Sequence, residues 1–256
     1  MTDSAGDEEL VAATADLPRP APTDPIEAFA ALGLLRLSEN DLRQVLSRIA
    51  ELAKVAIPGA AEVSVTLVSG TGAGTPAFTG AAAKAMDESQ YGEGRGPCLD
   101  AAARPGRVVS MPRAATDTRY PLFAATAARA GVGSSLSVGI QVVPRLTGAL
   151  NVYAHKTEAF GDEAVELAVT FANYAAVALA NAHLYETTSA LAGQMAEAMS
   201  SRAVIEQAKG VLMAQQGVDA DEAFAILSRA SQVSNRKLRD IAQGIVLGAR
   251  REPGSP

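Results

Sequence analysis

The sequence predicts an α+β fold: a mixed, largely antiparallel sheet with flanking helices, then a long connecting helix, then a compact unit of three helices. Three observations support this prediction. Short runs rich in β-branched residues lie between residues 62 and 154, a helical pattern begins at Asp162, and three apolar-periodic segments fill residues 201–248. With 256 residues, 48% of them hydrophobic, the chain is long enough for a medium domain and a small one.

The first 25 residues form a segment of their own. They carry six acidic residues against Arg19, the only basic one, and prolines crowd the end of the segment (Pro18, Pro20, Pro22 and Pro25). Such a segment buries too little apolar surface to offset the loss of chain entropy on folding. We expect residues 1–25 to be a disordered, acidic, proline-rich tail.

A first domain is expected over residues 38–186. Its first helix follows Ser38, since Ser38 and Asp41 have the spacing of a capping box and apolar residues then recur at helical intervals. The glycine cluster at residues 70–74 ends the first strand. Long irregular connections between residues 76 and 131 are typical of a binding face or of mobile loops. The expected strands are 62–69, 77–80, 107–110, 135–143 and 148–154, with a further helix at 122–130.

The helix that begins at Asp162 continues past the first domain without a convincing stop signal. Its repeating positions are Val177, Asn181, Leu184, Thr188, Leu191, Met195 and Ala198. Their spacing of three and four predicts that residues 187–200 form a connecting helix that pairs with a second copy as a parallel coiled coil. Because the seam contains Ala, Thr and Asn, we expect the pairing to be weak.

Charge is divided unevenly along the chain. The net charge is −6, yet residues 201–251 hold eight Lys and Arg residues against five Asp and Glu residues, a local excess of +3. A nucleic-acid partner is therefore compatible with the C-terminal part. The N-terminus lacks a signal-peptide pattern, and no run reaches the roughly 18 apolar residues of a bilayer span. We expect a cytoplasmic protein without a membrane partner.

No motif in the first domain predicts a catalytic or metal site. Cys98 is the single cysteine, which excludes an internal disulfide and a metal cage of several cysteines. The glycines at 92, 94 and 96 lack the Lys-Ser/Thr ending of a phosphate loop. A Cys98 nucleophile would need His155 or His183, and no motif links them. The favoured interpretation of Cys98 is a small packed residue at a helix start after Pro97.

Five stretches of the first domain together resemble a known fold family. They are Gly94-Arg-Gly-Pro-Cys-Leu-Asp-Ala101, Tyr120-Pro-Leu-Phe123, Gly131-Val-Gly-Ser-Ser-Leu136, Gly148-Ala-Leu-Asn-Val-Tyr153 and Ala159-Phe160. Over about residues 40–185 the chain resembles a GAF domain, a small-molecule sensor fold related to PAS. The resemblance implies a ligand between the sheet and residues 91–123, with candidate contacts at Tyr91, Cys98, Leu99, Tyr120 and Phe123. Haem, a cyclic nucleotide, a small metabolite and no ligand at all stay open, so the cofactor is unknown.

The first helix of the C-terminal unit has an apolar face and a polar flank. Arg202, Lys209 and Gln216 recur every seven residues along this flank. They form either a solvated helix edge or a binding surface. Gly210 costs about 1 kcal/mol in a helix interior relative to Ala, so it marks a close-packing point or the approach of a partner's backbone.

The second C-terminal helix has a clear start signal. Asp219 followed by Glu222 predicts a capped N-terminus, and Phe224, Leu227 and Ala230 are expected to form the buried stripe. This helix is interpreted as mainly structural.

The third C-terminal helix is expected to begin with Ser234 as its N-cap, followed by Asn235, Arg236 and Lys237. Two cations at this end oppose the helix dipole, a misfit of a few tenths of a kcal/mol for each exposed charge. A bound phosphate would remove the conflict, because free backbone N–H groups, a hydroxyl and two cations would converge on it. Arg239 is expected on the outer, basic face of the same helix.

The three helices carry a specific pattern. It reads Arg202-x-x-Ile205-x-x-Ala208-Lys209-Gly210-x-Leu212-Met213, then Asp221-Glu-Ala-Phe224-x-x-Leu227, then Asn235-Arg-Lys-Leu238-x-x-Ile241-Ala242-x-x-Ile245. Over residues 201–250 this closely resembles an ANTAR domain. The resemblance implies binding to paired hairpin loops in nascent transcripts, which prevents a terminator from forming. The candidate RNA contacts are Arg202, Lys209, Gly210, Gln216, Ser234, Asn235, Arg236, Lys237 and Arg239.

A GAF domain followed by an ANTAR domain is a regulator architecture. We therefore expect a signal-responsive, RNA-binding antiterminator that acts as a homodimer, since its RNA target has two hairpins. The main alternative is a GAF signalling scaffold whose C-terminal helices dock a protein partner. A GAF-type redox enzyme is the third alternative, and it is disfavoured because GAF-type methionine sulfoxide reductases use more than one cysteine.

Overall fold

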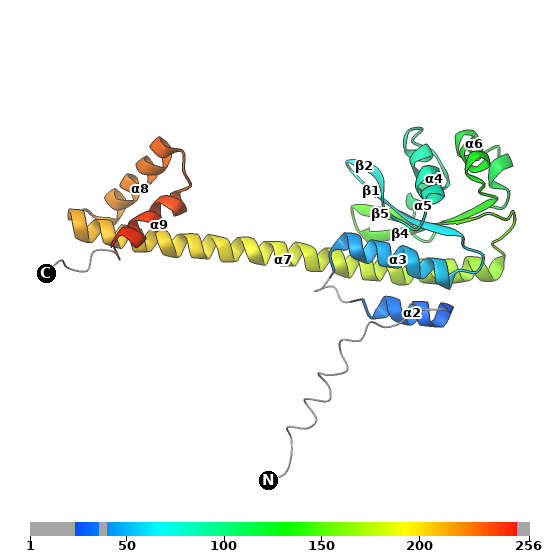
Figure 1. Ribbon diagram of the computed structural model, residues 1–256, viewed down its shortest axis with the longest axis horizontal. Helices are drawn as coiled ribbons and strands as arrows, with labels where there is room; N and C mark the ends of the chain where they lie inside the picture. Colours follow the sequence, from blue (N-terminus) through cyan, green and yellow to red (C-terminus); the bar gives the residue numbers. More distant parts are fainter. Residues whose placement is uncertain (1–23, 36–39, 250–256) are drawn as a thin grey trace, which may run out of the picture. The chain divides into compact units, whose positions relative to one another are not determined.

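The computed structural model describes residues 24–35 and 40–249, which form two compact units that divide between Glu186 and Thr187. The N-terminal unit contains a five-stranded sheet with helices on both faces, and the C-terminal unit is helical (Figure 1). The predicted α+β class is confirmed. Residues 1–23 of the predicted tail lie outside the described residues.

The sheet has the strand order β2-β1-β5-β4-β3, and each neighbouring pair is antiparallel. Its strands are β1 (Glu62–Ser69), β2 (Gly72–Phe78), β3 (Val108–Met111), β4 (Ser134–Val143) and β5 (Leu146–Ala154). The predicted strands at 135–143 and 148–154 are confirmed, and they pair with each other as the hairpin of β4 and β5. The strand expected at 77–80 instead begins at Gly72, within the glycine cluster, because Gly72 adopts a φ of 126° that lets β1 turn directly into β2.

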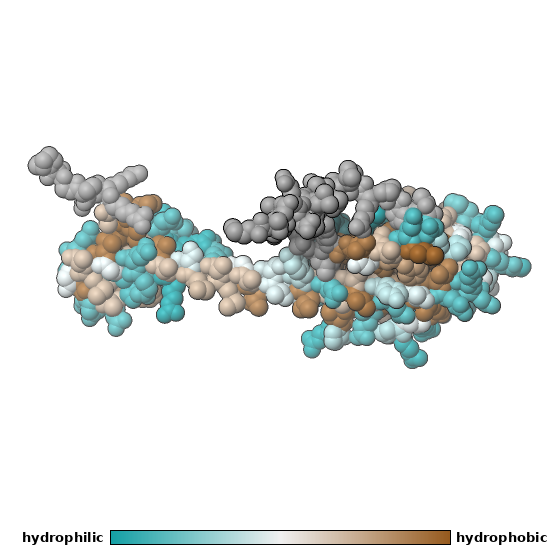
Figure 2. Space-filling model, turned by 90° about the horizontal axis from the view of Figure 1, so that it is seen from below, coloured by the Kyte–Doolittle hydropathy of each residue, from teal (hydrophilic) through white to brown (hydrophobic). Residues whose placement is uncertain are grey.

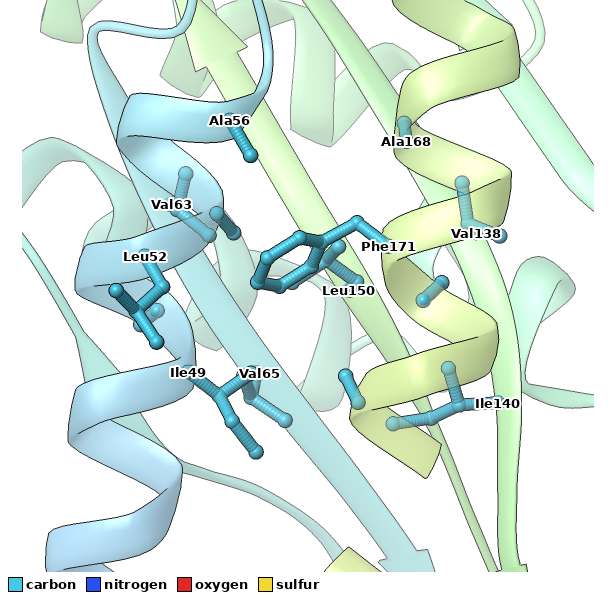
Figure 3. Packing of buried hydrophobic residues seen from close by; sticks show 14 of the residues in the cluster. Ile49, Leu52, Ala56, Val63, Val65, Val138, Ile140, Leu150, Ala168 and Phe171 are labelled. Carbon is cyan, nitrogen blue, oxygen red and sulfur yellow. The ribbon is translucent and has the colours of Figure 1, made fainter. Parts of the chain in front are cut away.

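One face of the sheet is covered by α3 (Leu42–Ala56) and by the first part of α7 (Asp162–Gln216). Figure 3 shows Phe171 of α7 reaching toward Leu52 of α3 over the sheet residue Leu150. Asp41 caps α3 in a capping box with Gln44. The capping box therefore begins three residues after the predicted one, which was expected to begin at Ser38. Ser38 lies outside the described residues.

An additional helix, α2 (Pro25–Gly33), lies where no element was predicted. Asp24 caps it by accepting a hydrogen bond from the Glu27 backbone N–H at 2.9 Å. Its Phe29 ring makes edge contacts with Phe171 and Tyr174 of α7, at centroid distances of 5.4 and 6.0 Å. The apolar residues of α2 thus extend the core on the α3–α7 side.

The other face of the sheet is covered by α4 (Ala81–Tyr91), α5 (Pro97–Ala102) and α6 (Pro121–Ala130), with the short 3-10 helix η1 (Ala114–Thr116) (Figure 1). The strand at 107–110 and the helix at 122–130 were predicted, but α4 replaces part of the segment that was expected to be irregular. A second core lies between these helices and the sheet. It is the candidate ligand site.

Helix α7 runs without interruption from the N-terminal unit into the C-terminal unit, as its missing stop signal predicted. All of its residues from Leu184 to Ser200 are exposed, and apolar and polar side chains alternate on the surface of this stretch in Figure 2. By length and composition, α7 is the one helix within residues 24–35 and 40–249 that could cross a membrane. A helix packed against a protein core meets the same criteria, and Phe171 and Leu179 of α7 are buried in that core, so this finding is a weak argument for a membrane span.

The C-terminal unit packs the end of α7 against α8 (Ala220–Ser234) and α9 (Leu238–Ala249). Its fully buried residues are few: Ala208, Leu212, Ala223, Leu227 and Ala242. The predicted capping box of α8 is confirmed, because the Asp219 carboxylate accepts from the Glu222 backbone N–H at 2.9 Å and Glu222 reaches back to the Asp219 N–H. With so small a core, most of the side chains of this unit are at its surface.

Candidate functional site

The five candidate ligand contacts of the N-terminal unit lie together in its second core. Cys98, Tyr120 and Phe123 are buried members of this cluster, and Tyr91 and Leu99 pack against it. They come from α4, α5 and α6 and the residue before α6, all on one face of the sheet. Their role in ligand binding stays a prediction.

A buried hydrogen-bond network centred on Asp87 of α4 lies in the same place, and sequence reasoning missed it. The Asp87 carboxylate accepts from the Tyr153 hydroxyl at 2.5 Å, from the Thr75 hydroxyl at 2.8 Å and from the Asn151 amide at 3.3 Å. The Tyr91 hydroxyl joins the network through Thr75, at 2.5 Å. Asp87 is fully buried, and these hydrogen-bond partners are all neutral.

Burial controls the ionisation of this network. Desolvation raises the pKa of Asp87 from 3.8 to about 6, although the hydrogen bonds from Tyr153 and the other hydroxyls lower it in part. Burial, followed by the charge of Asp87, also raises the pKa of Cys98 well above its usual range. The Cys98 thiol therefore stays protonated near neutral pH, which makes it a poor nucleophile.

A polar face of the sheet lies beside this network. Ser64 and Thr66 of β1 and Ser135, Ser137 and Asn151 of β4 and β5 are all buried. The Asn151 side-chain oxygen and the Ser135 hydroxyl have no hydrogen-bond partner in the described part of the chain. The alternation of polar and apolar residues along β4 and β5 could have indicated this polar face. A polar strand face is normally interpreted as facing solvent, however, and in this structure helices cover it.

In the C-terminal unit, the structure separates the candidate cations into two groups. Lys209 pairs with Glu206 at 3.0 Å, and Arg239 pairs with Glu197 and, at 3.6 Å, with Asp240. Arg202, Arg236 and Lys237 are exposed, and no ion pair to them occurs among the described residues. These three side chains can therefore bind anions without first breaking an ion pair with a described residue.

Ser234 does not cap α9, so this prediction was wrong. It is the last residue of α8, and its hydroxyl donates back to the Ala230 carbonyl at 2.6 Å. Asn235 then adopts the left-handed conformation, with φ 51° and ψ 36°, which ends α8. Arg236 and Lys237 follow in the connection, and α9 begins at Leu238, three residues later than the start at Asn235 that a Ser234 cap implies. The two cations therefore precede the helix and lie outside its first turn.

Two further expectations about this unit change. Phe224 is 45% exposed, because Ala223 and Leu227 occupy the core side of α8. Gly210 is not a close-packing point, since a Cβ atom there would meet nothing within 4 Å. Its remaining interpretation is the approach of a partner. Gln216 is exposed at the end of α7.

Comparison with protein-family models assigns both units. A GAF domain model matches residues 39–180, and an ANTAR domain model matches residues 193–246. This chain belongs to the GAF–ANTAR family. The GAF–ANTAR architecture combines a sensor domain with an RNA-binding antitermination module, so the protein is a regulator.

Two solved structures illustrate what the N-terminal part of this GAF–ANTAR protein is similar to. One is the GAF domain of a phosphoenolpyruvate-protein phosphotransferase from Coxiella burnetii, with 16% identity, a TM-score of 0.48, and coverage of 64% of this chain and 97% of that one. Another is the free methionine-R-sulfoxide reductase from Neisseria meningitidis in complex with its substrate, with 18% identity, a TM-score of 0.49, and coverage of 68% and 98%. None of the curated proteins compared matches the chain.

Proposed function

We propose that this protein is a signal-responsive antiterminator that binds paired hairpin loops in nascent transcripts and so prevents a terminator from forming. A signal at the GAF domain (residues 38–186) would alter the connecting helix (residues 187–200) and thereby the RNA-binding unit (residues 201–250). The protein would act in the cytoplasm, where its transcripts are made. The match to an ANTAR domain supports the RNA-binding part of this proposal.

The observation that carries the proposal is the group of unpaired cations in the C-terminal unit. Arg236 and Lys237 are adjacent, exposed and without carboxylate partners among the described residues, in the turn that leads into α9. Arg202 is similarly exposed on α7. Phosphate contacts from such side chains position RNA, and single-stranded loops then present their bases for recognition.

The exposed stretch of α7 supports the proposal that the protein acts as a dimer. Leu191, Met195 and Met199 are 57%, 59% and 72% exposed, within a segment whose residues are all exposed. A helix that is exposed on every side over several turns gains stability by pairing along its apolar seam. A second copy of α7 would cover this seam and bring two RNA-binding units to the two hairpins.

The test replaces Arg236 and Lys237 by Ala in the full chain and measures affinity for a two-hairpin RNA over a range of salt concentrations. The RNA is selected from a pool of two-hairpin molecules with randomised loops, using the wild-type protein. We expect the logarithmic salt slope to fall by about 1 for each phosphate contact that the substitutions remove. An Arg104→Ala variant in the GAF domain serves as control. Unchanged affinity and slope in the double variant would contradict the site assignment.

Docking of a protein partner is the second candidate function, and the exposed apolar residues of α8 favour it. Phe224 is 45% exposed and Val233 is 84% exposed. Exposed aromatic side chains such as Phe224 are enriched in protein interfaces. Binding that persists at several hundred millimolar salt, and that is abolished in Val233→Ser but not in the Arg236 and Lys237 variant, would favour this alternative.

A further inference from the structure

A polar hollow of about 320 Å³ lies in the ANTAR unit between α7 and α9. Glu197, Ser200, Ser201 and Val204 line it from α7. Arg239, Asp240 and Gln243 line it from α9. Its volume is at the lower end of the roughly 300–1,000 Å³ of small-molecule sites, so it can admit one planar group but not a helix.

The charges of the hollow exclude a phosphate as its occupant. Its one cation, Arg239, is already paired with the carboxylates of Glu197 and Asp240. Two carboxylates against one guanidinium leave the lining negative. A phosphate placed here would be repelled, whereas a neutral group with hydrogen-bond donors would be accepted.

The lining groups match the edge of a nucleobase. Carboxylates accept from exocyclic amino groups, and the Gln243 amide both donates and accepts. The planar Arg239 guanidinium, fixed by its two ion pairs, offers a surface on which an unstacked base can lie. Val204 supplies the apolar wall. The hollow thus combines hydrogen-bonding groups, a stacking surface and an apolar wall, which are the three elements of base recognition.

The surroundings of the hollow suit this occupant. Arg236 and Lys237 come just before α9, within three residues of Arg239, and Arg202 follows Ser201 directly on α7. These cations, which form no ion pair within residues 24–35 and 40–249, can hold the phosphates on either side of a base that enters the hollow.

From this geometry we infer that the hollow between α7 and α9 receives one unstacked loop base that carries an exocyclic amino group. Adenine, cytosine and guanine carry such a group, and uracil does not. The inference rests on the proposed RNA-binding function and adds a sequence-reading site to it. Arg239 is then a base contact, in place of the phosphate contact that its charge alone suggested.

The ion pair between Arg239 and Glu197 also helps to hold α9 against α7, but this structural contribution is small. The side chains of Glu197 and Arg239 are 61% and 37% exposed, and exposed pairs contribute roughly 0–1 kcal/mol to stability. Substitution of Gln243, which is exposed and takes no part in these ion pairs, should leave the fold intact. Variants of Gln243 can therefore test binding while the protein stays folded.

The experiment is a double-mutant cycle, in which a substitution of one protein side chain is combined with a substitution of one loop base. It uses the full chain and the selected two-hairpin RNA. Each loop base is replaced in turn by uracil or by an abasic site, and the affinities of wild type and Gln243→Ala are compared. Gln232→Ala, an exposed glutamine on α8, is the matched control. In the wild type we expect the substitution at one loop position to weaken binding about tenfold or more, since a good base contact discriminates by about 1–3 kcal/mol.

In Gln243→Ala that same base substitution should weaken binding much less, and the salt slope should equal that of the wild type, because no phosphate contact changes. Equal effects at every loop position in the wild type and in Gln243→Ala would overturn the inference while leaving RNA binding in place. A wild-type protein that selects no RNA from the pool would overturn the proposed function, and the inference with it.

Discussion

The buried carboxyl of Asp87 makes the stability of the GAF domain depend on pH in a defined direction. Its pKa of about 6 lies above the ordinary value of 3.8, so the folded state holds the proton more tightly than the unfolded state. Stability from this group is fully present below about pH 4 and is lost as pH rises through about 6. The full shift of this pKa corresponds to on the order of 3 kcal/mol of unfolding free energy.

Replacement of Asp87 by Asn removes this titration and keeps the size of the side chain. Between about pH 5 and about pH 7.5 the wild type should lose roughly 1.4 kcal/mol of unfolding free energy that Asp87→Asn does not lose. The absolute stability of the variant is less informative, because the Asn amide must find acceptors among hydroxyls that now donate to the carboxylate. The prediction therefore concerns the pH dependence.

Urea unfolding followed by tyrosine fluorescence gives the measurement. The chain has no tryptophan, and all five tyrosines lie at or before Tyr185, so the signal reports the N-terminal unit alone. Glu88→Gln, which changes an exposed carboxyl next to Asp87 on α4, is the matched control and should follow the wild type. Parallel pH profiles for the wild type and Asp87→Asn would show that Asp87 has an ordinary pKa and would refute the reasoning.

Three other predictions concern the C-terminal half. Leu191→Ser with Met195→Ser should weaken self-association at least tenfold, measured by sedimentation, because both side chains lie on the proposed seam; an unchanged dimer would place the interface elsewhere. Asp219→Ala should cost about 1 kcal/mol in the helical unfolding of the C-terminal unit, since it removes the cap of α8; no change in circular dichroism melting would argue against the capping box. Arg202→Ala should lower the salt slope of RNA binding more than Lys209→Ala, because Glu206 already neutralises Lys209; equal slopes would count against this division of the cations.

Elements with a strong local signal were predictable. The hairpin of β4 and β5 has alternating residues on both sides of a short turn, and the capping box of Asp219 and Glu222 marks the start of α8. Helix α7 was predictable because no strong local signal interrupts its periodicity. Each of these signals comes from residues that are close in the chain.

Elements whose inner side is polar or small were missed or misplaced. Two of the four buried residues of α4 are Asp87 and Gln90, so its inward face shows no apolar stripe. On α8, Ala223 and Leu227 are buried in the core shared with α7 and α9, whereas Phe224 is 45% exposed. Helical periodicity identifies a face, but the available space decides which residue of that face is buried.

The sequence by itself determined the two domain types, the basic excess of the C-terminal unit and the continuous helix between the units. Only the tertiary structure showed which charged side chains of the described residues form ion pairs and which do not. Arg239 meets Glu197, 42 residues away in the chain, and Asp87 meets Tyr153, 66 residues away. Folding brings these distant side chains together. The buried Asp87 carboxylate needs a hydrogen-bond partner in its region of low dielectric constant, whereas Arg239 and Glu197 meet at the surface. The spacing of residues along the chain indicates neither pair.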